Sequence, residues 1–404
     1  MKTLHNTLFI TLLTFFTIQF GISQQLPALV PYQKGGTWGY CDQNKKIIIP
    51  CTFSSASPFH EGLARVSNQK YQFGFINAQG KVVIPFKYAW AHSVHDGWIY
   101  VEQQSKEWGN VGGFIDTKGE VKIPMRLNTP PVPLPERERY QFSEGLIAVP
   151  WKYDPSKYGY RYADKSGKFV LDTKYEYATK FGNGLAAVKI SFKEAGYINR
   201  QGKVLFNDNY YTTSPFNDGL ARVRPNATKP EDDMKFGFIN TQGKVVISTD
   251  FYSFNNFNEG LVALQQAFGK NKWGFVDTEG NEAISFIYEK AFNFNEGLAL
   301  VVKNGKVGFV NKQGEVVIPF KFDYYQTFYE MHLNTRFVNG FAPVWLGKKM
   351  GFVNREGKLV VECKYDGFGS VFYEYDDFSK GVALVKQGKR QFYIDMQGNE
   401  YYED

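Results

Sequence analysis

The sequence predicts an all-β protein, built from about ten copies of one small unit that stack into an array. Aromatic residues make up 17% of the 404 residues, and 39 glycines accompany them, which favours strands and turns over helices. Two short sequence blocks also recur in a fixed order along almost the whole chain. Each unit is therefore expected to be a three-stranded antiparallel meander that needs its neighbours to bury its faces.

The first block is a turn signature, an Asp or Asn followed three residues later by Gly. The acidic or amide residue falls at positions 42, 77, 116, 164, 199, 240, 277, 311, 354 and 395. Its side chain is expected to bond the backbone of the turn, and the glycine is expected to adopt the left-handed conformation. In the first unit, Lys45 replaces the glycine.

The strand before this turn carries an aromatic-Gly-aromatic pattern, as in Phe73-Gly74-Phe75. The residue after the glycine is aromatic in all ten units and the next is small or aliphatic, so both faces should be buried. A glycine weakens a strand unless an aromatic ring lies across its bare backbone, which we expect here. Arg161 and Phe392 replace this glycine in the fourth and tenth units.

The second block reads Phe-x-(acidic or polar)-Gly-Leu-Ala and opens a further strand. It begins at Phe59, Phe142, Phe181, Phe216, Phe257, Phe294, Phe337 and Phe378, and it has decayed at Val94-His95-Asp96-Gly97-Trp98. Two alternate positions are always apolar, so one face should be fixed by packing and the other free. The residue before the glycine, such as Glu61, could form a carboxylate ladder for cations. The favoured interpretation is that it bonds backbone amides in its own turn.

These blocks resemble the repeats of the bacterial WG-repeat proteins, from Trp38-Gly39-Tyr40 and Trp273-Gly274-Phe275 to the Phe-x-Glu-Gly-Leu-Ala segments. The resemblance implies a repeat scaffold with no shared catalytic residues. We expect an array over residues 24–404, with the tenth unit truncated as a C-terminal cap. Ten units exceed the usual four to eight blades of a propeller, so an open curved solenoid is favoured over a closed propeller-like toroid.

Residues 1–23 read as a signal peptide, with Lys2, an apolar stretch and small residues at Gly21 to Ser23. We therefore expect export to the periplasm, cell surface or medium, with no transmembrane segment after signal removal. The formal charge of +7 is interspersed along the chain, which does not favour nucleic acid as a partner.

Few singular polar residues are available for chemistry. His60, His92, His95 and His332 include a His-x-x-His-Asp cluster, but the ligand count argues against a metal site. Cys41 and Cys51 flank one predicted hairpin, and the sequence leaves a disulfide between them open. No phosphate loop, dinucleotide fingerprint or nucleophile elbow occurs. We therefore expect no cofactor and no enzymatic activity.

Insertions at residues 90–111, 125–140 and 323–336 interrupt the repeats, and insertions in such arrays often gather on the binding face. The candidate binding residues are the tryptophans that cluster near the first two: Trp90, Trp98, Trp108 and Trp151. Their alternative role is to pin the insertions onto the array. The predicted function is an exported binding scaffold at the cell envelope, with a protein or an envelope polysaccharide as partner. A glycan or cell-wall binder, or an enzyme with a site in the insertions, are the alternatives.

Overall fold

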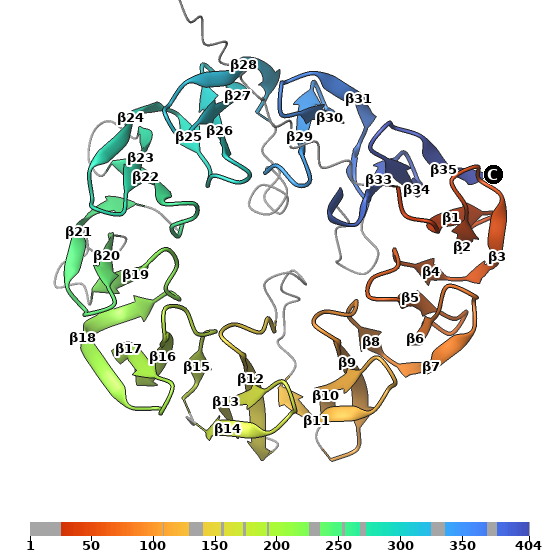
Figure 1. Cartoon of the computed structure of the whole chain (residues 1–404), viewed down its shortest axis with the longest axis horizontal. Helices are drawn as coiled ribbons and strands as arrows, with labels where there is room; N and C mark the ends of the chain where they lie inside the picture. The colour runs from red at the N-terminus through yellow and green to blue at the C-terminus, as the bar shows by residue number, and fades with distance from the viewer. Residues whose placement is uncertain are drawn as a thin grey trace, which may run out of the picture.

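The computed structural model describes residues 26–107, 109–128, 140–154, 157–172, 175–191, 194–225, 235–252, 255–266, 272–324, 336–369 and 378–403. These residues form small antiparallel sheets that are arranged radially around one centre (Figure 1). No α-helix occurs in these ranges, and one 3-10 turn, η3, spans Phe378–Lys380. The all-β prediction is confirmed. The predicted signal peptide lies outside the described residues.

Each predicted repeat contributes an inner, a middle and an outer strand. The inner strands follow the Gly-Leu-Ala block, or its equivalent in the first repeat: β1 (Val30–Lys34), β5 (Ala64–Ser67), β9 (Trp98–Ser105), β12 (Leu146–Asp154), β16 (Leu185–Ser191), β19 (Leu220–Pro225), β22 (Leu261–Gln266), β26 (Leu298–Lys303), β29 (Phe341–Leu346) and β33 (Val382–Gln387).

The middle strands carry the aromatic-Gly-aromatic pattern: β2 (Thr37–Cys41), β6 (Phe73–Ile76), β10 (Gly109–Asp116), β13 (Lys157–Asp164), β17 (Glu194–Asn199), β20 (Phe236–Asn240), β23 (Trp273–Asp277), β27 (Lys306–Asn311), β30 (Lys349–Asn354) and β34 (Arg390–Asp395). Strand β6 is buried along its whole length, as predicted from its two apolar faces.

The outer strands follow the Asx turn: β3 (Ile47–Phe53), β7 (Val82–Tyr88), β11 (Val121–Asn128), β14 (Phe169–Asp172), β18 (Val204–Thr213), β21 (Val245–Tyr252), β24 (Glu282–Tyr288), β28 (Val316–Asp323), β31 (Leu359–Tyr365) and β35 (Glu400–Glu403). Several repeats add a two-residue innermost strand that was not predicted: β4 (Ser55–Ala56), β8 (Trp90–Ala91), β15 (Tyr177–Ala178), β25 (Lys290–Ala291) and β32 (Gly367–Phe368). In β18 the outer strand continues into this position, because Thr213 pairs with Val223 as Ala56 pairs with Val66.

The Asx turns have the predicted geometry. In the second repeat, Oδ1 of Asn77 accepts hydrogen bonds from the N–H groups of Gln79 and Lys81, and Gly80 has φ +76°. A Cβ on Gly80 would lie 3.3 Å from the side chain of Ile49 in the preceding repeat. Each such turn is therefore also a contact between neighbouring repeats.

In three repeats an aromatic ring lies against the glycine of the middle strand, as predicted. A Cβ on Gly74 would lie 2.7 Å from the Ile84 carbonyl oxygen and 3.1 Å from the Phe86 ring. Phenylalanine rings approach Gly274 and Gly308 in the same way. At Gly39 and Gly351 the close neighbours are instead backbone atoms of the outer strand.

The face of the inner strand that was expected to be free is buried. Its variable position is occupied by Arg65 in β5, which is 3% exposed, and by Ala187 and Leu384, which are fully buried. Arg65 donates from Nη1 to the Ala91 carbonyl oxygen at 2.8 Å and lies over the rings of Phe73 and Trp90. The position varies because each pair of neighbouring repeats packs differently there, and not because water surrounds it.

The array is a closed ring, so the expectation of an open solenoid is wrong. Strand β35 pairs with β34 and also, in parallel, with β1, where Gln33 lies opposite Tyr402. Figure 1 shows β35 beside β1 where the ring closes. The rings of Trp38 and Tyr393 pack 5.7 Å apart in the same core cluster of the first and last repeats. The C-terminal strand is therefore the joint of the ring and not a solvated cap, and Tyr401 is 1% exposed.

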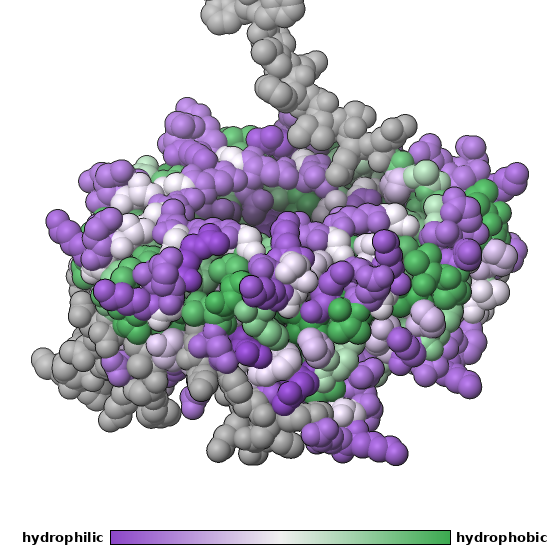
Figure 2. Space-filling view, turned by 60° about the horizontal axis from the view of Figure 1, so that its bottom comes forward, coloured by the Kyte–Doolittle hydropathy of each residue, from purple (hydrophilic) through white to green (hydrophobic). Residues whose placement is uncertain are grey.

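The outer wall of the ring carries apolar side chains between polar ones. Residues at the start of the outer strands are exposed there, including Ile48, Val82, Val121, Val245 and Val316. On the side that Figure 2 shows, hydrophobic patches lie between hydrophilic residues. No helix among the described residues is long and apolar enough to span a membrane.

Candidate functional site

The Phe-x-Glu-Gly-Leu blocks form two-residue turns at one end of the inner strands. In the second repeat, Glu61 has φ +47° and Gly62 has φ +82°, and His60 pairs with Leu63 across the turn. Positive φ at both central residues is the type I′ hairpin geometry. The residue before the glycine has a similar positive φ at Asp96, Glu144, Asn183, Asp218, Glu259, Glu296 and Asn339. This conformation is uncommon outside glycine.

The acidic residue of these turns bonds the next repeat and not its own turn. Glu61 accepts hydrogen bonds from the N–H groups of Asp96 at 2.9 Å and Gly97 at 2.8 Å. The same link joins Glu144 to Gly184, Asn183 to Gly219, Asp218 to Gly260, Glu259 to Gly297, and Glu296 to Asn339 and Gly340. The prediction of bonding within the same turn is wrong, and the carboxylates of these links are committed to backbone amides.

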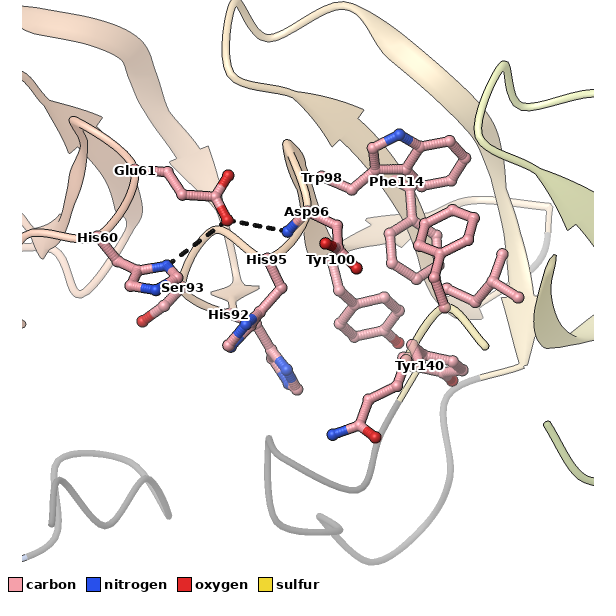
Figure 3. A pocket seen from close by; sticks show the side chains of 13 residues that line it. His60, Glu61, His92, Ser93, His95, Asp96, Trp98, Tyr100, Phe114 and Tyr140 are labelled. Atoms are coloured by element: carbon pink, nitrogen blue, oxygen red, sulfur yellow. Dashed lines mark hydrogen bonds and ion pairs between the residues drawn. The ribbon is translucent and has the colours of Figure 1, made fainter. Parts of the chain in front are cut away.

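Beside the Glu61 link lies a cavity of about 340 Å³ (Figure 3). Its walls come from the second, third and fourth repeats: His60, Glu61, His92, Ser93, His95, Asp96, Trp98, Tyr100, Phe114, Tyr140, Gln141, Phe142 and Ile147. Its size lies within the range of small-molecule sites.

One side of this cavity is polar. Nδ1 of His60 donates a 2.7 Å hydrogen bond to the Val94 carbonyl oxygen, which fixes the orientation of the imidazole. The ring of His95, which occupies the same repeat position as His60, lies 5.3 Å from the His60 ring. Nζ of Lys380, from the last repeat, lies 3.4 Å from Oγ of Ser93.

The other side is aromatic. Tyr140, which has φ +55°, packs on Tyr100 at 4.7 Å and on Phe114 at 5.5 Å. Trp98 packs edge-on against Phe142 at 4.9 Å. The cavity therefore combines a ring-lined wall with imidazole, hydroxyl and amide groups.

The predicted tryptophans have separate places. Trp98 lines the cavity and is 6% exposed. Trp90 packs edge-on against Phe73 and His92, and the latter also lines the cavity. Trp151 does not line the cavity but belongs to the same core cluster as Trp98, and it packs against Phe169 and near the guanidinium groups of Arg126 and Arg161. Trp108 lies outside the described residues, and the proposed binding role of the four stays a prediction.

Sequence reasoning missed the other aromatic walls of the cavity. Tyr100, Phe114, Tyr140 and Phe142 occupy ordinary repeat positions or insertion edges. The available signal was the decayed block of the third repeat, where His95 and Trp98 depart from the pattern. A departure from a repeat that is otherwise regular marks a place where its neighbours form different contacts.

The histidines and cysteines that the sequence singled out do not form a second site in the described ranges. Within the described ranges, no group of three or more His, Cys, Asp or Glu side chains is placed to hold a metal ion. His332 lies outside those ranges. Cys41, Cys51 and Cys363 are free thiols, and burial raises the pKa of Cys41 to about 12. The Cys41 thiol is therefore protonated at neutral pH.

The fold and its cavity define a ring of β-repeats with a small-molecule-sized site between repeats. The chain belongs to the family of WG containing repeats, whose pattern matches residues 38–70, 73–106, 160–191, 196–226, 236–267, 273–306, 308–330 and 350–390. The predicted resemblance is confirmed. No curated protein matches the sequence.

Solved structures resemble this chain in fold alone. A eukaryotic initiation factor superposes with a TM-score of 0.51 at 10% sequence identity, over 83% of this chain and 95% of that one. BamB from Moraxella catarrhalis matches with a TM-score of 0.35 at 9% identity, over 85% of this chain and 94% of that chain.

Proposed function

We propose that this WG-repeat ring is an exported binding scaffold of the cell envelope, and that the cavity beside Glu61 holds a sugar unit of an envelope polysaccharide. The single observation that carries the proposal is the cavity itself, with aromatic rings on one wall and hydrogen-bonding side chains on the other. Aromatic faces pack on the C–H faces of sugars, while hydroxyls need donors and acceptors at the rim.

The charge state of the cavity supports a neutral ligand. Its two carboxylates are already engaged, Glu61 by two backbone N–H groups and Asp96 by an ion pair with Lys165 at 3.9 Å. The same hydrogen bonds argue against Glu61 as a general base, because a general base must be available to accept a proton from the substrate.

Export rests on the N-terminal pattern of Lys2, the apolar stretch and Gly21 to Ser23. It is tested by sequencing the N-terminus of protein recovered from outside the cytoplasm. A mature chain that starts near Gln24 supports export, and an intact Met1 contradicts it.

Ligand binding is tested by isothermal titration of the purified protein with solubilised cell-wall polysaccharide fragments. His95→Ala and Gln141→Ala should weaken binding, because both side chains lie at the cavity. Trp98→Ala should weaken binding too, and its matched control is Trp345→Ala. Trp98 is 6% exposed and Trp345 is 8% exposed, but Trp345 packs in another core cluster. If Trp98→Ala and Trp345→Ala reduce affinity equally, or no fragment binds, the cavity is not a glycan site.

The same titration tests the four tryptophans as a set. Trp90→Ala, Trp98→Ala, Trp108→Ala and Trp151→Ala should weaken binding, whereas Trp273→Ala should mainly lower stability. Equal losses of stability in all five with unchanged affinity would assign the tryptophans to packing.

A further inference from the structure

The hairpins between inner and middle strands all lie on one face of the ring. In every repeat the inner strand begins at the Glu-Gly turn, or at the equivalent position in the first repeat, and runs to this hairpin. The middle strand then returns to the Asx turn. The repeats are arranged radially around one centre (Figure 1). Because the inner and middle strands are antiparallel, these hairpins lie at the strand ends opposite the Asx and Glu-Gly turns.

Five consecutive hairpins of this face, from the eighth repeat through the ring joint to the second, together carry more basic than acidic side chains. We call this set of residues the basic arc. Its basic side chains, nine in the described ranges, are Lys34, Lys70, Lys303, Lys306, Lys348, Lys349, Lys386, Lys389 and Arg390. The four acidic side chains that lie at these hairpins are Glu289, Asp323, Asp366 and Glu403.

The acidic side chains of the arc also serve the fold. Glu289 accepts hydrogen bonds from the N–H groups of Asn304 and Gly305, and Asp366 accepts one from Gly388. Three lysines of the arc form ion pairs with these carboxylates: Lys349 with Asp366 at 2.6 Å, Lys306 with Asp323 at 2.5 Å and Lys34 with Glu403 at 3.0 Å. The carboxylates thus hold the hairpins in place, and Lys70, Lys348 and Lys389 are exposed at the tips.

Two apolar side chains project among these lysines. Tyr71 is 64% exposed at the tip of the second repeat's hairpin, where its own φ is +58°. Leu346 is 43% exposed at the tip of the ninth repeat's hairpin, next to Gly347 and Lys348. Tyr71 lies in its turn and Leu346 is the last residue of β29, directly before the turn, so both apolar side chains are exposed on a charged face.

We propose that the basic arc docks the ring on the surface of an anionic lipid bilayer. Lysines at hairpin tips on one face can approach a flat layer of phosphate headgroups together, and each contributes to the attraction. Tyr71 and Leu346 favour a bilayer over a soluble polyanion, because an aromatic and an aliphatic side chain gain by entering the headgroup region. This inference does not depend on the glycan cavity, which is lined by aromatic side chains and turn residues of the second to fourth repeats.

The test is cosedimentation of the full mature chain with vesicles. Vesicles of phosphatidylcholine mixed with phosphatidylglycerol should pellet the protein, whereas pure phosphatidylcholine vesicles should not. Binding should weaken as salt is raised, because screening shortens the range of the lysine charges to about 8 Å at physiological ionic strength. The triple variant Lys70→Glu/Lys348→Glu/Lys389→Glu should lower the partition coefficient by at least ~10-fold.

The matched control is Lys81→Glu/Lys203→Glu/Lys244→Glu, which makes the same charge change at exposed lysines beside the Asx turns of the opposite face. It should bind as the unaltered protein does, and thermal unfolding should show that both triple variants are folded. An equal loss of binding in the control would overturn the assignment of the basic arc.

The second variant, Tyr71→Ser/Leu346→Ser, separates a bilayer from a soluble polyanion. It should weaken vesicle binding while leaving any retention on dextran sulfate unchanged. If vesicle binding is unaffected by these substitutions and dextran sulfate binds the arc as tightly as the vesicles do, the partner is a polyanion and the bilayer proposal is wrong.

Discussion

The Gly97 N–H donates a 2.8 Å hydrogen bond to Oε2 of Glu61, a residue 36 positions earlier in the chain and in the preceding repeat. Repeats of this ring are therefore joined by carboxylates as well as by packed rings such as Tyr40 on Phe59 and Phe275 on Phe294. The acidic residue recurs because the neighbouring turn offers two backbone amides that need an acceptor.

The link predicts the effect of removing one carboxylate. Glu296 accepts from Asn339 at 2.6 Å and from Gly340 at 2.8 Å. Glu296→Ala should lower the free energy of unfolding by about 1–2 kcal/mol, because two buried or half-buried N–H groups lose a charged acceptor. Urea denaturation measures it, with Glu356→Ala, an exposed turn residue, as the control. A loss of the same size in the control would mean that the link adds nothing.

Ring closure predicts how damage spreads. Tyr401→Ala removes a ring that is 1% exposed and should destabilise by roughly 3–5 kcal/mol. Because β35 pairs with both β34 and β1, amide hydrogen exchange should accelerate in the first and the last repeat together. Faster exchange in the last repeat alone would indicate an open array.

The turn glycines predict a difference between two sites of equal φ. Gly243, at φ +78°, would place a Cβ 3.1 Å from the Phe206 ring of the preceding repeat, whereas Gly219, at φ +80°, has no atom within 4 Å. Gly243→Val should cost about 1–3 kcal/mol. Gly243→Ala should lower the free energy of unfolding by more than Gly219→Ala does. Both substitutions incur the backbone strain, and only the first displaces Phe206. Equal shifts in melting temperature would exclude the contact as a cause.

Restoring the repeat pattern at Arg161 should harm the protein. Arg161 occupies the glycine position of β13, and its guanidinium lies 4.1 Å from the Phe169 ring centre and 5.2 Å from that of Trp151. Arg161→Gly should reduce the free energy of unfolding by about 1–2 kcal/mol. Arg161→Met keeps the aliphatic stem and should recover part of the loss. A gain in stability from Arg161→Gly would refute the cation–π account.

The hairpin carboxylates predict a pH dependence at low pH. The hydrogen bond from Lys349 and the N–H of Gly388 hold the pKa of Asp366 below its usual value of 3.8. The ionised carboxylate therefore stabilises the folded state fully above pH 3.8, and this contribution disappears as the pH falls through the lowered pKa. Asp366→Asn should be less stable at neutral pH, and the gap should close in acid. A gap that persists unchanged in acid would remove the ionic explanation.

Local features of the repeat were predictable because their causes lie within a few residues. The Asn77 turn and its Gly80 follow from side-chain and backbone geometry over four positions. The hydrogen-bond partner of Glu61 could not be predicted. The sequence shows that an acidic residue recurs, but it does not show which of two adjacent turns that residue faces. Closure of the ring could not be predicted from the repeat pattern either, because it depends on small rotations between repeats that add up around the ring.

The cavity illustrates the same limit. His60 and His95 could be paired from their equivalent repeat positions, and their rings do meet. Tyr140 could not be assigned, because its ring reaches Tyr100 from the edge of an insertion that follows no repeat spacing. Residues of an insertion have no equivalent elsewhere in the chain from which their placement can be inferred.

The pairing of Gln33 with Tyr402 sets a condition on biosynthesis. The two residues lie 369 positions apart, so the open edge of β1 is covered only after β35 has been synthesised. Until then, Trp38 and the edge of β1 present an unpaired strand and an uncovered aromatic ring, both of which promote aggregation. A variant that lacks β35 would carry that exposed edge permanently, so the solubility of the first repeat depends on a strand that is made more than three hundred residues later.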